Sequence, residues 1–146
     1  MSPRILVVVV LAVVVAVAAV VARVAASDDE EPAASDCAAA GVEKPLPREF
    51  PRSYPLPPGT RVTQAAASAA GSLFVQAAAP LSAPEAVSFY RTEPARAGWR
   101  TAAALEREGA GVSASFRGPG FSGTWTVDEI AGCPAAALLT LRFVRA

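Results

Sequence analysis

The side chains that could do chemistry in this chain are carboxylates, hydroxyls, one lysine and two cysteines, because the sequence contains no histidine. The absence of histidine excludes Ser-His-Asp and Cys-His catalysis and every zinc site that uses histidine. Glu106 and Glu108 have the spacing of paired carboxylates on one strand face, and Asp128 and Glu129 are adjacent. Both pairs are more typical of solvated strand ends. No serine lies in a Gly-x-Ser-x-Gly motif, and a Ser-Lys pair would have to recruit Lys44. We therefore predict no catalytic, metal or cofactor site, and no enzymatic activity.

The two cysteines, Cys37 and Cys133, lie far apart in the sequence. An even number of cysteines in an exported chain favours a disulfide bond. Such a bond would close a loop of nearly the whole folded part, for which the chain-entropy treatment gives about 4 to 5 kcal/mol of stabilisation. The alternative is a pair of buried free thiols. A redox role is disfavoured, because the chain has no Cys-x-x-Cys motif and no histidine or lysine beside either cysteine.

The N-terminal segment contains only Ile, Leu, Val and Ala from Ile5 to Ala22. As a helix this run would span roughly 27 Å, which is close to the hydrocarbon thickness of a bilayer. A helix in the core of a soluble domain is the alternative, but the run has no polar face. We predict that residues 5–22 cross the lipid bilayer.

Charges on either side of this segment suggest its orientation. Arg4 precedes it, whereas Arg23 and the acidic stretch Asp28–Glu31 follow it. We expect the N-terminus in the cytoplasm and the remainder exported, with residues 1–26 retained as a single-pass signal anchor in the cell membrane. Secretion after signal-peptide cleavage is the alternative, because the small residues Val24–Ala26 precede Ser27.

After the anchor we expect an acidic spacer over residues 27–36, a proline-rich extended arm over 37–58 and one α+β extracytoplasmic domain over 59–146. The formal net charge of the chain is zero, and its arginines form no basic run. Such a chain has no electrostatic footprint for nucleic acid, and we exclude that partner.

The proline-rich arm has two interpretations. Pro55 and Pro58 form a PxxP motif that Arg48 or Arg52 could flank, which is typical of a recognition segment. The second interpretation is an extended arm laid over the domain, with Phe50 and Tyr54 as apolar anchors.

The clearest local signal is a helix start. Ser82 can cap a helix, Pro84 suits its first turn, and Glu85 completes a capping box. Pro94 should kink or end this helix before Gly98.

Alternating apolar and polar residues predict strands on both sides of the helix. The expected strands are 60–67, 72–79, 99–106, 112–117, 121–127 and 136–144. Two hairpins are expected, one around Gly71 and one around the glycines at 118, 120 and 123, which we interpret as turn residues. The order is β-β-α-β-β-β-β, which predicts an α+β two-layer sandwich of an antiparallel sheet and one helix. Large residues should form much of the interface: Trp99, Phe116, Trp125, Leu139, Leu141 and Phe143. The alternation places Leu105 on the same strand face as Trp99.

The segments Phe89-Tyr90-Arg91 and Ala97-Gly98-Trp99-Arg100, followed by glycine-rich hairpins, resemble those of uncharacterised exported or membrane-anchored domains of high-GC actinobacteria. The alanine, arginine and valine bias is similar as well. The resemblance covers about residues 56–144. It implies an extracytoplasmic α+β domain without a known activity, and it transfers no functional residue.

Two kinds of function fit these features. The first is a noncatalytic interaction or structural module of the cell envelope, which would bind an envelope protein or the wall through its sheet or its arm. The second is a domain that holds a small apolar ligand or lipid between helix and sheet, where Ala65–Ala67 and Ala77–Ala79 would leave room.

Overall fold

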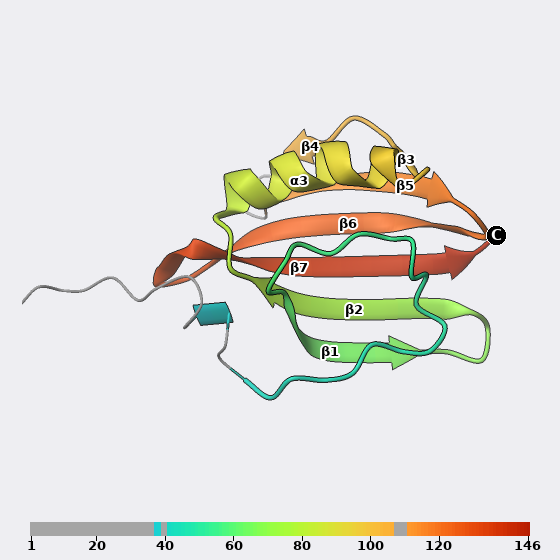
Figure 1. Cartoon of the computed structure of the whole chain (residues 1–146), viewed down its shortest axis with the longest axis horizontal. Coiled ribbons are helices and arrows are strands. Elements are labelled where there is room, and N and C mark those ends of the chain that lie inside the picture. Colours follow the sequence, from blue (N-terminus) through green and yellow to red (C-terminus); the bar gives the residue numbers. More distant parts are fainter. Residues whose placement is uncertain (1–36, 39–40, 107–110) are drawn as a thin grey trace, which may run out of the picture. The chain divides into compact units, whose positions relative to one another are not determined.

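The computed structural model describes residues 37–38, 41–106 and 111–146 (Figure 1). The predicted membrane segment 5–22, the acidic spacer 27–36 and Glu108 lie outside these residues. Within the described ranges, no helix has both the length and the apolarity needed to cross a bilayer.

The described part of the chain is an antiparallel sheet of seven strands with one helix. Its elements are β1 (Arg61–Ala67), β2 (Ser72–Ala79), α3 (Ala83–Arg96), β3 (Arg100–Thr101), β4 (Leu105–Glu106), β5 (Val112–Gly118), β6 (Phe121–Ile130) and β7 (Cys133–Arg145). The strand order is β1-β2-β7-β6-β5-β3, and β4 also pairs with β5. The pairing of β2 with β7, which are distant in the sequence, joins the hairpin of β1 and β2 to the strands that follow the helix.

Both predicted hairpins are confirmed, since β1 pairs with β2 and β5 with β6. Two of the glycines interpreted as turn residues are not in the turn, however. Gly118 ends β5 and Gly123 lies within β6. A Cβ at Gly118 would lie 2.2 Å from the Trp99 ring, and one at Gly123 would lie 1.9 Å from the Arg142 carbonyl oxygen. These glycines are needed because large groups pack directly against the strand backbone.

The strand predicted over 99–106 is interrupted. Its two ends form β3 and β4, while residues 102–104 are not in a strand, so the sheet has one strand more than predicted. The prediction that Leu105 shares the face of the buried Trp99 is wrong, because its side chain is 68% exposed. The strand is interrupted because residues 102–104 between its two ends are alanines. Alanine is a poor strand former and contributes little apolar area.

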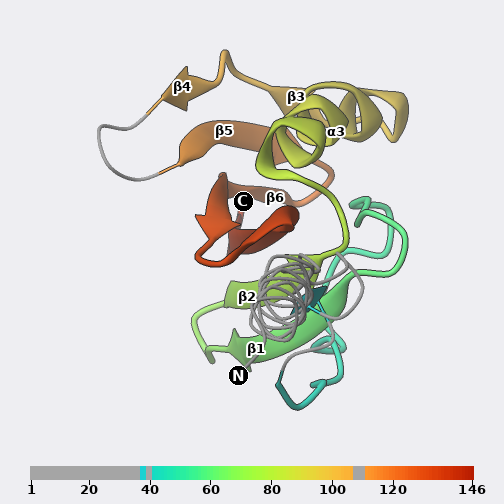
Figure 2. The same ribbon diagram turned by 90° about the vertical axis from the view of Figure 1, so that its left-hand side faces the viewer.

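The helix α3 begins as predicted. The Glu85 carboxylate accepts hydrogen bonds from the Ser82 backbone N–H at 2.9 Å and from the Ser82 hydroxyl at 2.7 Å. Pro94 lies inside the last turn, and the helix ends at Arg96 before Gly98. The helix packs against β3, β6 and β7, so it covers only part of one sheet face (Figure 2).

The proline-rich arm covers the rest of that face and belongs to the core. Phe50 and Tyr54 are 7% and 3% exposed, which agrees with the interpretation of the arm as an apolar cover. The Tyr54 ring centroid lies 4.6 Å from that of Phe116 and 5.0 Å from those of Trp99 and Phe143. The folded unit thus begins before residue 59, and the arm is not a separate segment.

We call the face beneath α3 and the arm the covered face. The largest fully buried side chains lie on this face or pack against it from α3 and the start of β3: Tyr90, Trp99, Trp125, Phe143, Leu139, Leu141, Val75 and Val127. The inward positions predicted for the last strand are confirmed, because Leu139, Leu141 and Phe143 are all 0% exposed. Full burial of one such side chain is worth about 1.5 to 3 kcal/mol, so this face supplies most of the hydrophobic stabilisation.

Candidate binding surface

The opposite side of the sheet, which we call the open face, carries the alternate residues of the same strands. On β6, Thr124, Thr126 and Asp128 alternate with the buried Trp125 and Val127. In Figure 1, α3 and the arm cross in front of the sheet, so the open face is turned away from the viewer. Strand register arranges its side chains in rows perpendicular to the strands.

The first of these rows, the polar row, consists of amide and hydroxyl side chains from β1 to β5, and the exposed Leu105 on β4 continues it as the register partner of Ser113. It runs across β1, β2, β7, β6 and β5 through Gln64, Gln76, Thr140, Thr126 and Ser113. Each residue is half-buried or exposed. Amide and hydroxyl groups both donate and accept hydrogen bonds, so this row can match a polar partner without a net charge.

The next two rows, the arginine rows, lie toward the end of the sheet where β7 ends. One runs through Ala66, Phe74, Arg142, Thr124 and Ser115, and the other through Ser72, Val144, Ser122, Arg117 and Arg100. They contain three arginines and no carboxylate. The Arg142 guanidinium lies over the Phe74 ring, 5.5 Å from its centroid.

Arg100 and Arg117 are directly opposite each other on β3 and β5. Like charges in opposite positions destabilise a strand pair. In the described part of the chain, the ion pairs join Arg61 to Glu43 and Arg96 to Glu93, and none involves Arg100, Arg117 or Arg142. The positive charge of the arginine rows is therefore not neutralised by the described carboxylates.

Two hollows follow the arginine rows. The larger, of about 620 Å³, is lined by residues of β3, β5 and β6 that include Arg100, Arg117 and Thr124. The smaller, of about 300 Å³, is lined by residues of β1, β2 and β7 that include Phe74 and Arg142. Thr124, which lines the larger hollow, and Arg142, which lines the smaller one, are register partners on neighbouring strands.

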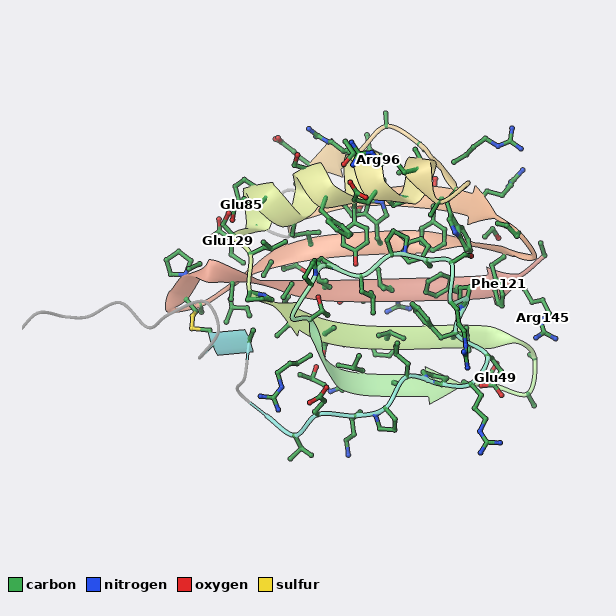
Figure 3. The ribbon with its side chains drawn as sticks, in the orientation of Figure 1. Glu49, Glu85, Arg96, Phe121, Glu129 and Arg145 are labelled. Carbon is green, nitrogen blue, oxygen red and sulfur yellow. A yellow bond between two sulfur atoms is a disulfide. The ribbon has the colours of Figure 1, made fainter. Side chains whose placement is uncertain are left out.

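A third hollow, of about 790 Å³, lies between the start of α3 and the strands β4 to β6. It brings together Glu106, Asp128 and Glu129, which the sequence placed at two separate strand ends, and adds Arg91. Glu106 and Glu129 are exposed, as expected for solvated strand ends, and Asp128 is half-buried. Figure 3 labels Glu129 at this end of the sheet. No group of acidic, cysteine or histidine side chains suited to a metal ion occurs in the described ranges.

Comparison with models of known protein families, with curated proteins and with solved structures found no match. The chemistry of the described residues is therefore the basis for assigning a function.

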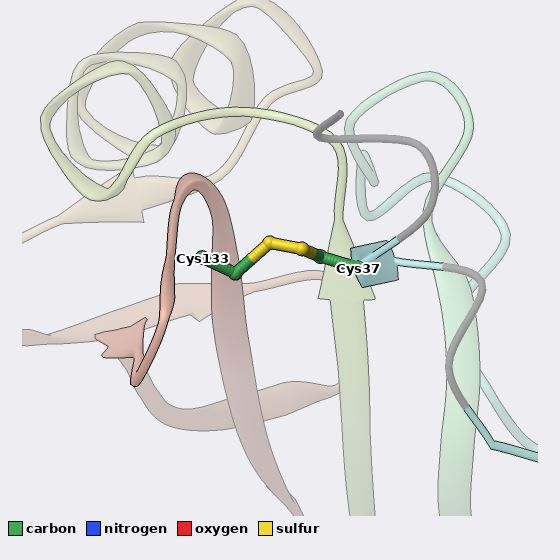
Figure 4. Close-up of a disulfide and its surroundings, with 2 residues drawn as sticks. All are labelled: Cys37 and Cys133. Carbon is green, nitrogen blue, oxygen red and sulfur yellow. A yellow bond between two sulfur atoms is a disulfide. The ribbon is translucent and has the colours of Figure 1, made fainter. Parts of the chain in front are cut away.

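The structure contains the disulfide bond predicted from the sequence. Cys37 and Cys133 are bonded, with 6.2 Å between their Cα atoms (Figure 4). Cys133 is the first residue of β7 and is buried, so the bond links the start of the arm to the start of β7. A structural disulfide is typical of an oxidising, extracytoplasmic compartment.

The hydroxyls of Tyr54 and Tyr90 are buried in the core and have no hydrogen-bond partner in the described structure. Burial raises the pKa of both phenols far above the usual value, and the neighbouring Tyr90 adds to the shift at Tyr54. Both stay neutral at physiological pH, so neither can act as a general base. By contrast, hydrogen bonds from the Ser82 hydroxyl and backbone lower the pKa of exposed Glu85.

Two other candidates from the sequence lie in the arm. The exposed Lys44 pairs with β1 through its backbone, donating a 2.8 Å hydrogen bond to the Val62 carbonyl. In the PxxP motif, Pro55 is half-buried and Pro58 is exposed, while Pro57 between them is buried. The motif is partly occupied by contacts within the domain, so the sheet offers the more accessible surface.

The sequence favoured binding through the sheet or the arm but did not indicate which face of the sheet or which of its residues. The alternation of Thr124, Thr126, Thr140 and Arg142 with apolar residues was visible, but the strand order was not. Without the β2–β7 pairing, no argument from the sequence could align these residues with Phe74 and Gln76.

Proposed function

We propose that this chain is a membrane-anchored, extracytoplasmic module without catalytic activity, which binds another component of the cell envelope through the open face. The observation that carries the proposal is the difference between the two faces of the sheet. One face is filled by α3 and the arm, whereas the other presents rows of amide, hydroxyl and guanidinium groups.

The proposed location rests on two features. The disulfide between Cys37 and Cys133 supports an oxidising compartment, and the apolar run 5–22 has the length of a membrane span. A retained anchor would keep the module attached to the membrane. Cleavage after Val24–Ala26 would release the same module, so recovery of the chain from membranes or from the medium distinguishes these forms.

A noncatalytic role is supported by the types of polar group that the chain offers. It has no histidine, and its two tyrosines are buried with raised pKa values. The open face offers neutral hydrogen-bonding groups and arginines, which suit binding better than proton transfer.

The alternative, an apolar ligand between helix and sheet, has less support. Ala77 and Ala79 are fully buried in the core cluster, and stacked rings of Tyr54, Tyr90 and Trp125 occupy the helix–sheet interface. Side chains thus fill the space in which such a ligand would lie.

Site-specific photo-crosslinking of the full chain in the cells that produce it tests the proposal. A photoreactive residue at Thr126, in the centre of the open face, should crosslink to an envelope component. The same residue at Ser88, an exposed position of α3, is the control. Crosslinks specific to Thr126 would support the proposal; no crosslinks from Thr126, or equal yields at both positions, would contradict it.

A further inference from the structure

We infer that the arginine rows bind an acidic polysaccharide, an extended sugar chain that carries carboxylates and lies across the strands. This inference rests on the proposed docking role of the open face and names the class of partner.

The positive charge of the arginine rows supports an acidic partner. Arg100, Arg117 and Arg142 are exposed, and no carboxylate belongs to their rows. On the open face, the described acidic residue Asp128 is the register partner of Leu138, four residues from Arg142 along β7, which is about 14 Å at strand spacing. That distance exceeds the screening length of about 8 Å at physiological salt. A bound carboxylate between Arg100 and Arg117 would relieve their mutual repulsion and form charge-assisted hydrogen bonds.

The hydroxyl groups of the arginine rows support a sugar as the partner. Ser72, Ser115, Ser122 and Thr124 surround the arginines in the same two rows. Each hydroxyl can donate and accept a hydrogen bond, as sugar hydroxyls do. Because the backbone groups within a sheet are already paired, the face can bind only through side chains. An acidic peptide would instead pair its backbone with a strand edge.

Two apolar side chains of the arginine rows also suit a sugar ring. Phe74 is half-buried and Val144 is 53% exposed, and both lie within the arginine rows. The C–H side of a sugar ring can pack on such groups while its hydroxyls reach the neighbouring serines and threonines.

The dimensions of the surface favour a polymer over a small anion. Each arginine row crosses four inter-strand gaps, or about 19 Å at the usual strand separation. The two hollows, of about 300 and 620 Å³, are lined by Arg142 and Thr124 respectively, which are register partners, so an extended chain that crosses this strand pair can reach both.

The test is a titration of the full chain in detergent micelles with polygalacturonate, which carries a carboxylate on each sugar. Dextran tests the need for charge, and poly-L-glutamate tests the need for sugar. We expect saturable binding of polygalacturonate that weakens as salt increases, and at least tenfold weaker binding of both other polymers. No binding of polygalacturonate, or equally tight binding of either comparison polymer, would overturn the inference.

Paired variants assign the site. Arg117→Gln with Arg142→Gln should weaken polygalacturonate binding at least tenfold. Arg52→Gln with Arg91→Gln removes the same charge from exposed positions outside the arginine rows and should change it less than twofold. Circular dichroism melting establishes that each variant is folded; if the first pair fails to fold, Ser115→Ala with Ser122→Ala replaces it, with an expected loss of at least threefold. Equal losses in the arginine pair and its control, or unchanged binding in the variants of the arginine rows, would overturn the assignment.

The two proposals fail separately. Absence of polygalacturonate binding together with specific crosslinks from Thr126 would remove the acidic polysaccharide and leave the docking role. Loss of the Thr126 crosslinks would remove the docking role itself.

Discussion

The covered and open faces belong to the same strands, yet the covered face is apolar and the open face is mostly polar. On β6 and β7, Trp125 and Leu141 are 0% exposed, whereas their neighbours Thr124 and Arg142 are exposed. One face is closed by α3 and the arm, and the other displays side chains that can bind. The comparison indicates that the fold depends on one set of alternate residues and leaves the other set free for function.

The largest expected effect on stability is the difference between substitutions at two adjacent residues of β6 whose side chains point to opposite faces. Trp125→Ala should lower the free energy of unfolding by about 3 to 5 kcal/mol, because it leaves a cavity in the aromatic core. Thr126→Ala should lower it by no more than about 1 kcal/mol, the range of strand propensity. Urea unfolding followed by circular dichroism measures both values. Similar losses for the two variants would show that the open face is also structural.

The next largest effect on stability concerns the disulfide bond that links the arm to the sheet. Replacing both cysteines, Cys37→Ser with Cys133→Ser, should cost about 2 to 5 kcal/mol, because the bond closes a long loop that includes the arm. The measurement is urea unfolding of the double variant beside the oxidised native chain. The native chain in reductant is the matched control and should lose a similar amount; stability equal to that of the oxidised chain would contradict a structural role.

The contrast between the faces was partly predictable from the sequence. Strict alternation in β7 identified Leu139, Leu141 and Phe143 as buried, and the capping box fixed the start of α3. These signals are local and depend on the period of each element.

Other features depend on contacts between distant segments. A lone Tyr54 in a proline-rich arm has no periodicity that reveals its neighbours, and β2 gives no local sign that it pairs with β7. The roles of Gly118 and Gly123 likewise depend on the large groups packed against them. The rows of the open face could not be assembled until the strand order was known.

A smaller effect should appear at alkaline pH. The chain has two tyrosines, and burial raises the pKa of both in the folded state. The unfolded phenols ionise near pH 10, so this contribution to stability is complete below about pH 10 and is lost as the pH rises further. Each pH unit above that value should cost about 1.4 kcal/mol per tyrosine.

Absorbance of tyrosinate at alkaline pH, recorded together with circular dichroism, checks this expectation. Both phenols should ionise only as the sheet unfolds. Ionisation of either phenol near pH 10 with the fold intact would show that the covered face is open to water.

The smallest effect concerns the unpartnered hydroxyls of the covered face. Tyr54→Phe should leave the free energy of unfolding unchanged or raise it by up to about 1 kcal/mol, because it removes a buried polar atom without a partner. Tyr90→Phe provides a matched comparison in α3. A loss of more than about 1 kcal/mol, measured by urea unfolding, would instead indicate that a buried water satisfies the hydroxyl.

The division of roles between the faces is tested most directly by measuring crosslinking and stability in the same variant. With the photoreactive residue at Thr140, the double substitution Thr124→Ala and Thr126→Ala alters the open face beside it. We expect the crosslinking yield to fall at least fivefold and the free energy of unfolding to fall by no more than about 2 kcal/mol. An unchanged yield, or a loss of several kcal/mol, would contradict a fold held by the covered face and a binding role for the open one.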